Sequence, residues 1–174
     1  GNTDPKKNTP GTLKAYAEYV RRSENPLPLL VADLGEQPAE AILREIGEPR
    51  LRGMLRLAGY IPNSDLPAIY NRASAFLYTS LRESFGIPQL EAMACGTPVV
   101  TSATSAIPEV AGEGAILVDP TDPKAIADAL LRLETDAAFR ARQVAYGLER
   151  VKRFSWEKTA RHLLALYESL GKTN

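Results

Sequence analysis

Short apolar runs alternate with amphipathic stretches along the whole chain. The runs are bounded by turn-prone residues and are typical of strands buried in a parallel sheet. They predict strands at residues 27–32, 54–58, 74–79, 98–101 and 115–118. Between them, apolar positions three and four residues apart predict helices, as Ile126, Leu130 and Leu133 do. The predicted helices lie at residues 14–22, 39–46, 108–110, 123–133, 136–154 and 156–170, with one more after Ser64 or Asp65 and one after Glu83. This order predicts an α/β fold, a Rossmann-like doubly wound parallel sheet with helices on both faces.

Composition and charge narrow the class of protein. The chain has 174 residues, of which 44% are hydrophobic and 24% charged, which is ordinary for one globular domain. The net charge is zero, so nothing favours nucleic acid or an anionic membrane as an electrostatic partner. Cys95 is the only cysteine, so no internal disulfide can form, and no membrane span or signal peptide is visible. We therefore expect a cytoplasmic location.

The stretch from Glu83 to Glu91 carries the candidate chemistry. Glu83 lies in the loop that leaves the strand at residues 74–79, and Glu91 lies in the first turn of the next helix. Pro88 opens that helix, and Gly96 stands just past its end, as helix termini favour. Ligands bind in doubly wound sheets at this position, outside the carboxyl ends of the strands. Gly86 lets the backbone approach a ligand closely, and the N–H groups of residues 85–89 suit a phosphate.

Two carboxylates beside a phosphate site make chemical sense as acceptors for sugar hydroxyl groups. An ionised carboxylate accepts paired hydrogen bonds from neighbouring hydroxyls, so the pattern indicates a nucleotide sugar or a similar polyol phosphate. The structural alternative is that Glu91 complements the helix dipole while Glu83 caps a turn. The spacing alone leaves both interpretations open.

The same residues carry a resemblance to a known family. Glu83-x7-Glu91, followed by Ala92-Met93-Ala94-Cys95-Gly96-Thr97-Pro98-Val99-Val100, resembles the donor-site signature of family 4 glycosyltransferases, which are retaining enzymes of GT-B architecture. Further similar blocks follow in the family's order, namely residues 101–112, residues 115–120 and Phe154-Ser155-Trp156-Glu157-Lys158-Thr159-Ala160. The basic loop Asp4-Pro5-Lys6-Lys7-Asn8 resembles the start of the family's nucleotide-binding domain. The resemblance thus covers nearly the whole chain.

The resemblance implies a role for each candidate residue. Lys7 would neutralise the donor diphosphate and Glu83 would hold the transferred hexose, so these two are the expected catalytic residues. Glu91 would hold the ribose. The sugar and phosphate would be lined by Ser84, Phe85, Gly86 and Ile87, and the base by Tyr60, Ile61 and Leu66. The donor would be a UDP- or GDP-hexose, with no cofactor and no metal. Asn2 stands where the family commonly has an arginine, so one cation of the basic pair is missing.

The resemblance also sets expectations about domain organisation. It implies that residues 1–174 form a single donor-binding domain, with a helix at about 156–170 that packs on an absent N-terminal acceptor domain. This fragment alone would be inactive. The family places a central strand before the basic loop, which Gly1-Asn2-Thr3 does not provide. That strand was either cut away or is supplied from elsewhere, so self-association and strand exchange are expected as alternatives.

Three hypotheses about the function of this protein follow from these observations. The first is retaining transfer of a hexosyl group in polysaccharide or glycolipid biosynthesis, by an enzyme whose full-length form associates peripherally with the inner face of the membrane. The block Ser105-Ala106-Ile107-Pro108-Glu109-Val110 resembles mannosyl- and rhamnosyl-type members that act on surface polysaccharides. The second is a noncatalytic module for donor binding or assembly, and the third is a GT-B-like sugar-nucleotide epimerase. An epimerised sugar nucleotide as product would identify the third.

Overall fold

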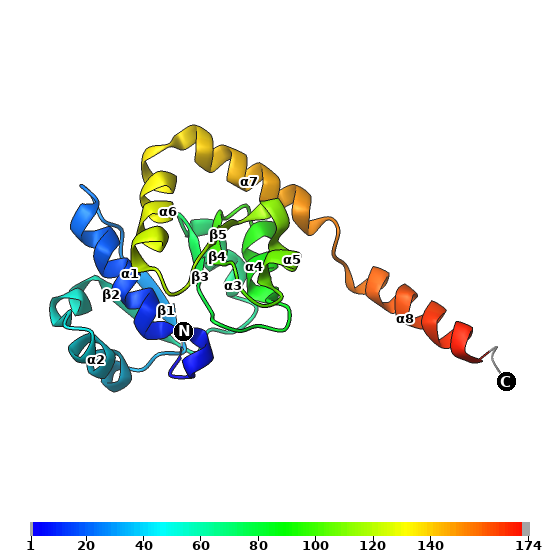
Figure 1. The fold of residues 1–174 in the computed structure, drawn as a ribbon, viewed down its shortest axis with the longest axis horizontal. Coiled ribbons are helices and arrows are strands. Elements are labelled where there is room, and N and C mark those ends of the chain that lie inside the picture. The colour runs from blue at the N-terminus through cyan, green and yellow to red at the C-terminus, as the bar shows by residue number, and fades with distance from the viewer. Residues whose placement is uncertain (1, 172–174) are drawn as a thin grey trace.

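The chain folds into an α/β body from which one helix extends, as the computed structural model of residues 2–171 shows (Figure 1). The strands are β1 (Leu29–Ala32), β2 (Leu55–Gly59), β3 (Phe76–Tyr78), β4 (Val99–Ser102) and β5 (Ile116–Val118). The α-helices are α1 (Thr9–Arg22), α2 (Glu36–Glu45), α3 (Leu66–Arg72), α4 (Ile87–Ala94), α5 (Ile107–Ala111), α6 (Pro123–Thr135), α7 (Ala137–Val151) and α8 (Trp156–Gly171). Short 3-10 helices at Pro5–Lys7, Pro49–Met54 and Gly112–Gly114 complete the described elements. The predicted class, parallel strands with helices on both sides, is confirmed.

The strands form two sheets. β1 pairs in parallel with β2, and β3, β4 and β5 pair in parallel in that order. Figure 1 shows the pair β1 and β2 on one side of the body and the group β3, β4 and β5 next to it. Among residues 2–171, no strand lies between β1 and β3, so the doubly wound sheet is interrupted at its centre. All four residues of β4 are buried, whereas β1 and β3 are only partly buried.

Helix ends follow the local sequence signals. The Asp122 side chain caps α6 by accepting hydrogen bonds from the backbone N–H groups of Lys124 and Ala125. Asp136 caps α7 in the same way, since its carboxylate accepts from the N–H of Phe139. Such caps satisfy backbone donors that the first helical turn leaves without partners. The same short segment therefore ends α6 and starts α7 in a new direction.

Helices α1 and α6 hold the two sheets together on one face. Leu13 and Tyr16 of α1 are buried in the cluster around β1 and β2, which Ala127 of α6 also joins. Ala15 of α1 and Ile126 of α6 belong instead to the cluster around β4 and β5. Each helix therefore contributes to both hydrophobic clusters, so the body stays one unit although the strands are not continuous.

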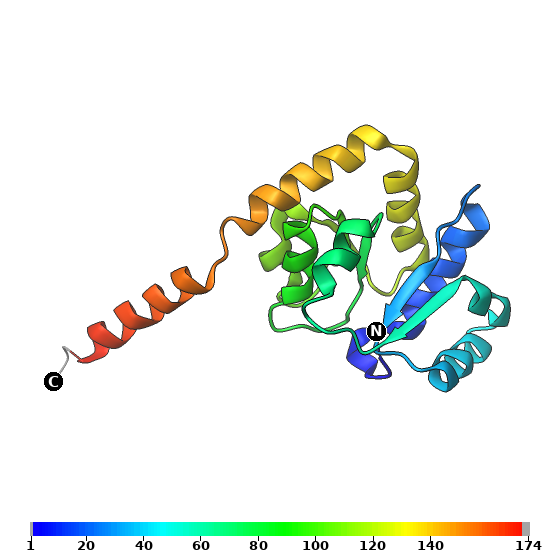
Figure 2. The same ribbon diagram turned by 180° about the vertical axis from the view of Figure 1, so that it is seen from behind.

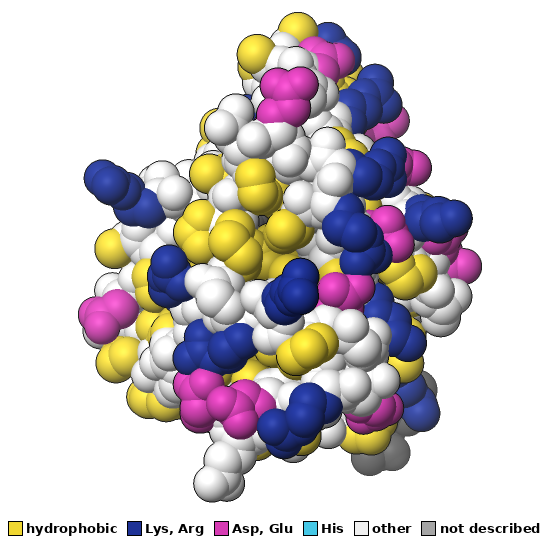
Figure 3. Space-filling model, turned by 90° about the vertical axis from the view of Figure 1, so that its left-hand side faces the viewer, with side chains coloured by type: hydrophobic (Ala, Val, Ile, Leu, Met, Phe, Trp, Pro, Cys, Tyr) yellow, Lys and Arg dark blue, Asp and Glu magenta, His cyan; other side chains and the backbone are white. Residues whose placement is uncertain are grey.

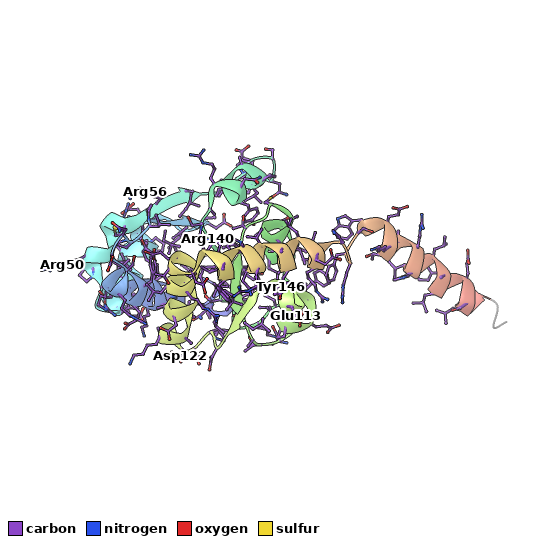
Figure 4. The ribbon with its side chains drawn as sticks, turned by 90° about the horizontal axis from the view of Figure 1, so that it is seen from above. Arg50, Arg56, Glu113, Asp122, Arg140 and Tyr146 are labelled. Carbon is purple, nitrogen blue, oxygen red and sulfur yellow. The ribbon has the colours of Figure 1, made fainter. Side chains whose placement is uncertain are left out.

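Helix α8 stands apart from this body. Figures 1 and 2 show it extending away beyond the end of α7, and Figure 4 shows its side chains projecting into the surroundings. None of its residues is buried. Its exposed apolar side chains are Trp156, Leu163, Leu164, Leu166, Tyr167 and Leu170. An apolar stripe of this size is normally covered by another surface.

The surface carries charges of both signs. Figure 3 shows Lys and Arg mixed with Asp and Glu on the face it presents, around a group of apolar side chains. This mixture agrees with the zero net charge. Within the described part of the chain, no helix has the length and apolar character needed to cross a membrane.

Candidate functional site

The basic N-terminal loop is fixed at the carboxyl ends of the strands. Asn8 donates from Nδ2 to the carbonyl oxygens of Thr79 and Pro120, at 3.1 and 2.8 Å, just beyond β3 and β5. The Leu81 N–H donates to the carbonyl oxygen of Lys6 at 2.7 Å. Asn8 adopts a left-handed backbone conformation with φ of 54°, which asparagine tolerates better than most residues. These bonds hold the loop at the edge where parallel sheets bind ligands.

Lys7 and Glu83 form an ion pair in this loop region. Lys7 Nζ lies 2.6 Å from Glu83 Oε1, and the two side chains are only 28% and 14% exposed. Partial burial raises the pKa of Glu83, but hydrogen bonds from Lys7, Tyr78 and Ser80 outweigh it, so that pKa lies below its ordinary value. Burial and the nearby Glu83 raise the pKa of Tyr78. Glu83 is therefore ionised at neutral pH, and the two residues predicted to be catalytic are in direct contact.

A second loop holds the Glu83 loop from the side. Ser102 Oγ donates to the carbonyl oxygen of Ser80 at 2.6 Å, and both residues are buried. Thr104 Oγ1 donates to the carbonyl oxygen of Leu81 at 3.2 Å, and the Glu83 N–H donates to Ser105 Oγ at 3.0 Å. This hydroxyl clamp, formed by Ser102, Thr104 and Ser105, orders the backbone that presents Glu83. It binds the loops after β3 and β4 together.

The start of α4 requires glycine. Gly86 has φ of 92°, a left-handed conformation, and a Cβ atom added there would lie 2.8 Å from Gln89 Nε2. Pro88 lies in the first turn of α4, as predicted, and Gly96 follows Cys95 at its end with φ of 72°. Helix α4 therefore begins directly after a close turn, and its first N–H groups lie at the carboxyl edge of the sheet.

A cavity of about 1050 Å³ opens beside these loops. The predicted site residues along its wall are Lys7, Tyr60, Ile61, Leu66, Ile87 and Glu91. Tyr70 Oη donates to Glu91 Oε2 at 3.4 Å, and burial, followed by the charge of Glu91, raises the pKa of Tyr70. Glu91 itself remains exposed, and Tyr60 is 79% exposed. The structure thus brings six of the ten predicted site residues to one cavity.

The other predicted residues lie near this wall but not on it. Glu83 does not line the cavity, but its carboxylate contacts Lys7, which does. Ser84 is exposed. The Phe85 ring packs edge-to-face on Phe154, with ring centroids 5.8 Å apart, close to the start of α8. Gly86 is buried at the turn into α4. Ser84 and Phe85 therefore do not line the cavity in this structure.

Several residues at the site were not singled out from the sequence. Asn8, Tyr78, Ser80 and the hydroxyl clamp all contribute to the position of Lys7 or Glu83. The run of hydroxyl residues from Thr101 to Ser105, directly after a predicted strand, was a usable signal. Across residues 2–171, no group of three His, Cys, Asp or Glu side chains is arranged to hold a metal ion. At this edge, Lys7 and the amino end of α4 contribute positive charge.

These features define a doubly wound α/β domain with a charged pair and a cavity at the carboxyl edge of its sheet. Residues 1–150 match the family described as "Glycosyl transferases group 1". The chain belongs to this family.

Related sequences include enzymes that transfer sugars. The chain is 35% identical to O-antigen chain mannosyltransferase B of Escherichia coli over 170 residues, which are 98% of this chain and 45% of that protein. It is 40% identical to D-inositol 3-phosphate glycosyltransferase of Corynebacterium jeikeium in an alignment of 168 positions that covers 91% of this chain and 39% of that protein. The chain therefore spans less than half the length of these relatives.

Solved structures share the fold. Sucrose-phosphate synthase of Thermosynechococcus elongatus is 28% identical and superposes with a TM-score of 0.81, over 98% of this chain and 44% of that one. The Anabaena protein HepE, solved in complex with UDP-glucose, is 19% identical with a TM-score of 0.81, over 97% of this chain and 47% of its own. The second likeness shows the fold alone.

Proposed function

We propose that this chain is the donor-binding domain of a retaining glycosyltransferase that uses a nucleotide-diphosphate hexose. The observation that carries the proposal is the Lys7–Glu83 pair, held at the carboxyl edge of the sheet beside the amino end of α4. Membership of the group 1 family supports it. The identity to an O-antigen mannosyltransferase favours mannose as the sugar and surface polysaccharide as the product.

Lys7 and Glu83 would divide the donor between them. A lysine ammonium group has three donor hydrogens, and Glu83 takes one of them, so two remain for the departing diphosphate. Together with the first N–H groups of α4, Lys7 would stabilise the negative charge that develops on the leaving group. Glu83, kept ionised by its neighbours, would accept hydrogen bonds from hexose hydroxyls.

The cavity wall would hold the nucleoside. Glu91 would accept hydrogen bonds from the ribose hydroxyls, with Tyr70 bonded to its other side. Tyr60, Ile61 and Leu66 would cover the base, and the exposed ring of Tyr60 has the freedom to close over it. Ser84 and Phe85 would approach the sugar only after the loop rearranges.

The acceptor site would lie on a second domain. We propose that the exposed apolar stripe of α8 packs on that domain and that residues 2–171 alone bind donor without transferring it. The full-length enzyme would retain the configuration of the anomeric carbon, which NMR of the first-formed product can test. An inverted product would refute the retaining assignment and leave donor binding unaffected.

Calorimetric titration with UDP, GDP and their hexose conjugates tests donor binding directly. One nucleotide should bind, and Glu91→Ala should weaken binding about tenfold or more, the loss of one charge-assisted hydrogen-bonded contact. Glu40→Ala is the matched control, because Glu40 is an exposed carboxylate on α2 outside the cavity. Equal binding by the wild type and Glu91→Ala would refute the ribose assignment.

A further inference from the structure

We propose that Asp33 recognises the base of the nucleotide donor and makes the cavity selective for guanine. Asp33 directly follows β1, is exposed, and lines the cavity. This inference rests on the proposed function and deepens it, because a base is present only if the cavity binds a nucleotide sugar.

Asp33 has an uncommon backbone conformation. In the described part of the chain, three residues other than glycine have a positive φ, namely Asn8, Asp33 and Ser105, with values of 54°, 57° and 53°. All three lie at the carboxyl edge of the sheets, because Asn8 is bonded just beyond β3 and β5, Asp33 follows β1, and Ser105 follows β4. Residues held in sparsely populated backbone conformations cluster at ligand sites.

The side chains of these three residues differ in what they bind. Asn8 donates two hydrogen bonds to carbonyl oxygens beyond β3 and β5, and Ser105 accepts one from the Glu83 N–H. Each of these two residues therefore fixes a loop of the site. The Asp33 carboxylate, by contrast, has no hydrogen bond or ion pair with another residue among residues 2–171. A carboxylate presented to a cavity in this way indicates a partner outside the chain.

The end of β1 is shaped to present this carboxylate. The pairing register between β1 and β2 shifts between Val31 and Ala32, and such irregularities redirect side chains next to active sites. The Asp33 N–H donates to the carbonyl oxygen of Gly59 at 2.8 Å, so the backbone of Asp33 is fixed at the end of β2. Gly59 itself has φ of 61°, and glycine is the usual residue where only the backbone conformation matters. The turn alone therefore does not account for an aspartate after β1.

Asp33 lies at the end of the cavity that is assigned to the base. β1 and β2 are neighbours (Figure 1), and Tyr60 and Ile61, which would cover the base, directly follow Gly59. The bond between Asp33 and Gly59 therefore places Asp33 beside the loop that would hold the base. The diphosphate and the hexose would lie at the other end of the donor, near Lys7.

A carboxylate discriminates between the bases. An ionised carboxylate only accepts hydrogen bonds, and two adjacent donors satisfy both of its oxygens. Guanine has such a pair on one edge, its N1–H and its 2-amino group. Uracil has a single N3–H between two carbonyl oxygens, which a carboxylate repels, and adenine and cytosine place an acceptor nitrogen beside their amino group. An Asp33 carboxylate that faces this edge of the base therefore selects guanine.

Calorimetric titration with GDP, UDP and inosine diphosphate tests the assignment. The base of inosine diphosphate keeps the N1–H of guanine but lacks the 2-amino group. We expect the wild type to bind GDP about tenfold or more tightly than inosine diphosphate, because the paired contact is incomplete with the latter. This ratio tests the proposal without any substitution in the protein. UDP should also bind more weakly than GDP.

Asp33→Asn removes the charge and one of the two acceptors while keeping a residue that tolerates positive φ. It should weaken GDP binding about tenfold, abolish most of the preference for GDP over inosine diphosphate, and leave the affinity for UDP unchanged. Asp65→Asn is the matched control, because Asp65 is an exposed carboxylate directly before α3 that does not line the cavity. It should leave all three affinities unchanged, and equal urea midpoints for the wild type and Asp33→Asn would establish an intact fold.

The possible failures separate this inference from the proposed function. Tighter binding of UDP than of GDP, or equal binding of GDP and inosine diphosphate by the wild type, would overturn the guanine assignment and leave donor binding established. An equal loss of affinity for all three nucleotides in Asp33→Asn would show that the carboxylate does not read the base. Binding of none of the three would overturn the proposed function and this inference with it.

Discussion

Removing the Lys7–Glu83 ion pair should cost more free energy of unfolding than removing an ion pair of equal length on the surface. The Lys7 and Glu83 side chains are 28% and 14% exposed, and Nζ lies 2.6 Å from Oε1. Exposed pairs contribute about 0.2–1 kcal/mol, while hydrogen bonds to charged groups contribute about 1.5–3 kcal/mol. The contribution of a half-buried ion pair should lie between these two ranges, so we expect a coupling free energy of about 1–2 kcal/mol for Lys7 and Glu83.

A double-mutant cycle in urea measures this coupling. The free energies of unfolding of the wild type, Lys7→Met, Glu83→Gln and the double variant give the interaction term. Glu149, near the end of α7, and Lys152, just after it, provide the matched control, because their charged atoms also lie 2.6 Å apart while the Lys152 and Glu149 side chains are 70% and 72% exposed. The control cycle should give about 0.5 kcal/mol or less.

The coupling free energy between Lys7 and Glu83 should fall as the pH is lowered into the acid range. The pKa of Glu83 is lowered in the folded state, so its contribution is complete above the ordinary carboxyl pKa. It is lost as the pH falls through the lowered folded-state value. Equal coupling in the two cycles at neutral pH, or coupling at Lys7–Glu83 that persists in strong acid, would refute the argument from burial and charge.

Two further substitutions test the loops that carry the pair. Gly86→Ala should destabilise the protein by about 1–3 kcal/mol, because φ is 92° and the new Cβ would lie 2.8 Å from Gln89 Nε2. Gly47 has φ of 77° but open space around it, so Gly47→Ala should lower the free energy of unfolding in urea by less than Gly86→Ala does. A larger loss for Gly47→Ala than for Gly86→Ala would contradict the steric account. Ser102→Ala should cost about 1–3 kcal/mol by leaving the buried Ser80 carbonyl without its donor, and an unchanged urea midpoint would contradict this.

Local sequence signals were sufficient for most elements of the fold. The apolar runs located all five strands, and Pro88 and Gly96 marked the limits of α4. Helix α1 begins at Thr9 rather than near Lys14, because Pro10 and Gly11 obscured the helical pattern of its first turn. Predicted strands such as residues 74–79 were too long, because β3 covers only Phe76–Tyr78.

Contacts between distant residues could not be predicted in this way. The Lys7–Glu83 pair joins positions 76 residues apart, and nothing in either segment alone indicates the other. The packing of Phe85 on Phe154 is of the same kind, and it turns Phe85 away from the cavity that the motif predicted. The motif predicts Glu83 in the loop after β3, where the structure has it, whereas the direction of each side chain depends on three-dimensional packing. The roles of the site residues in donor binding remain predictions.

The isolation of α8 has a practical consequence for every folding experiment on this chain. Trp156 is the only tryptophan, it is 81% exposed, and it lies on a helix without buried residues. A 16-residue helix that buries none of its residues against the described part of the chain is marginally stable in water, so its helix–coil equilibrium should be nearly independent of the body. Tryptophan fluorescence would then report solvation of α8 and miss unfolding of the sheets. The buried rings of Tyr16, Tyr19 and Tyr70 are the intrinsic probes that follow the body.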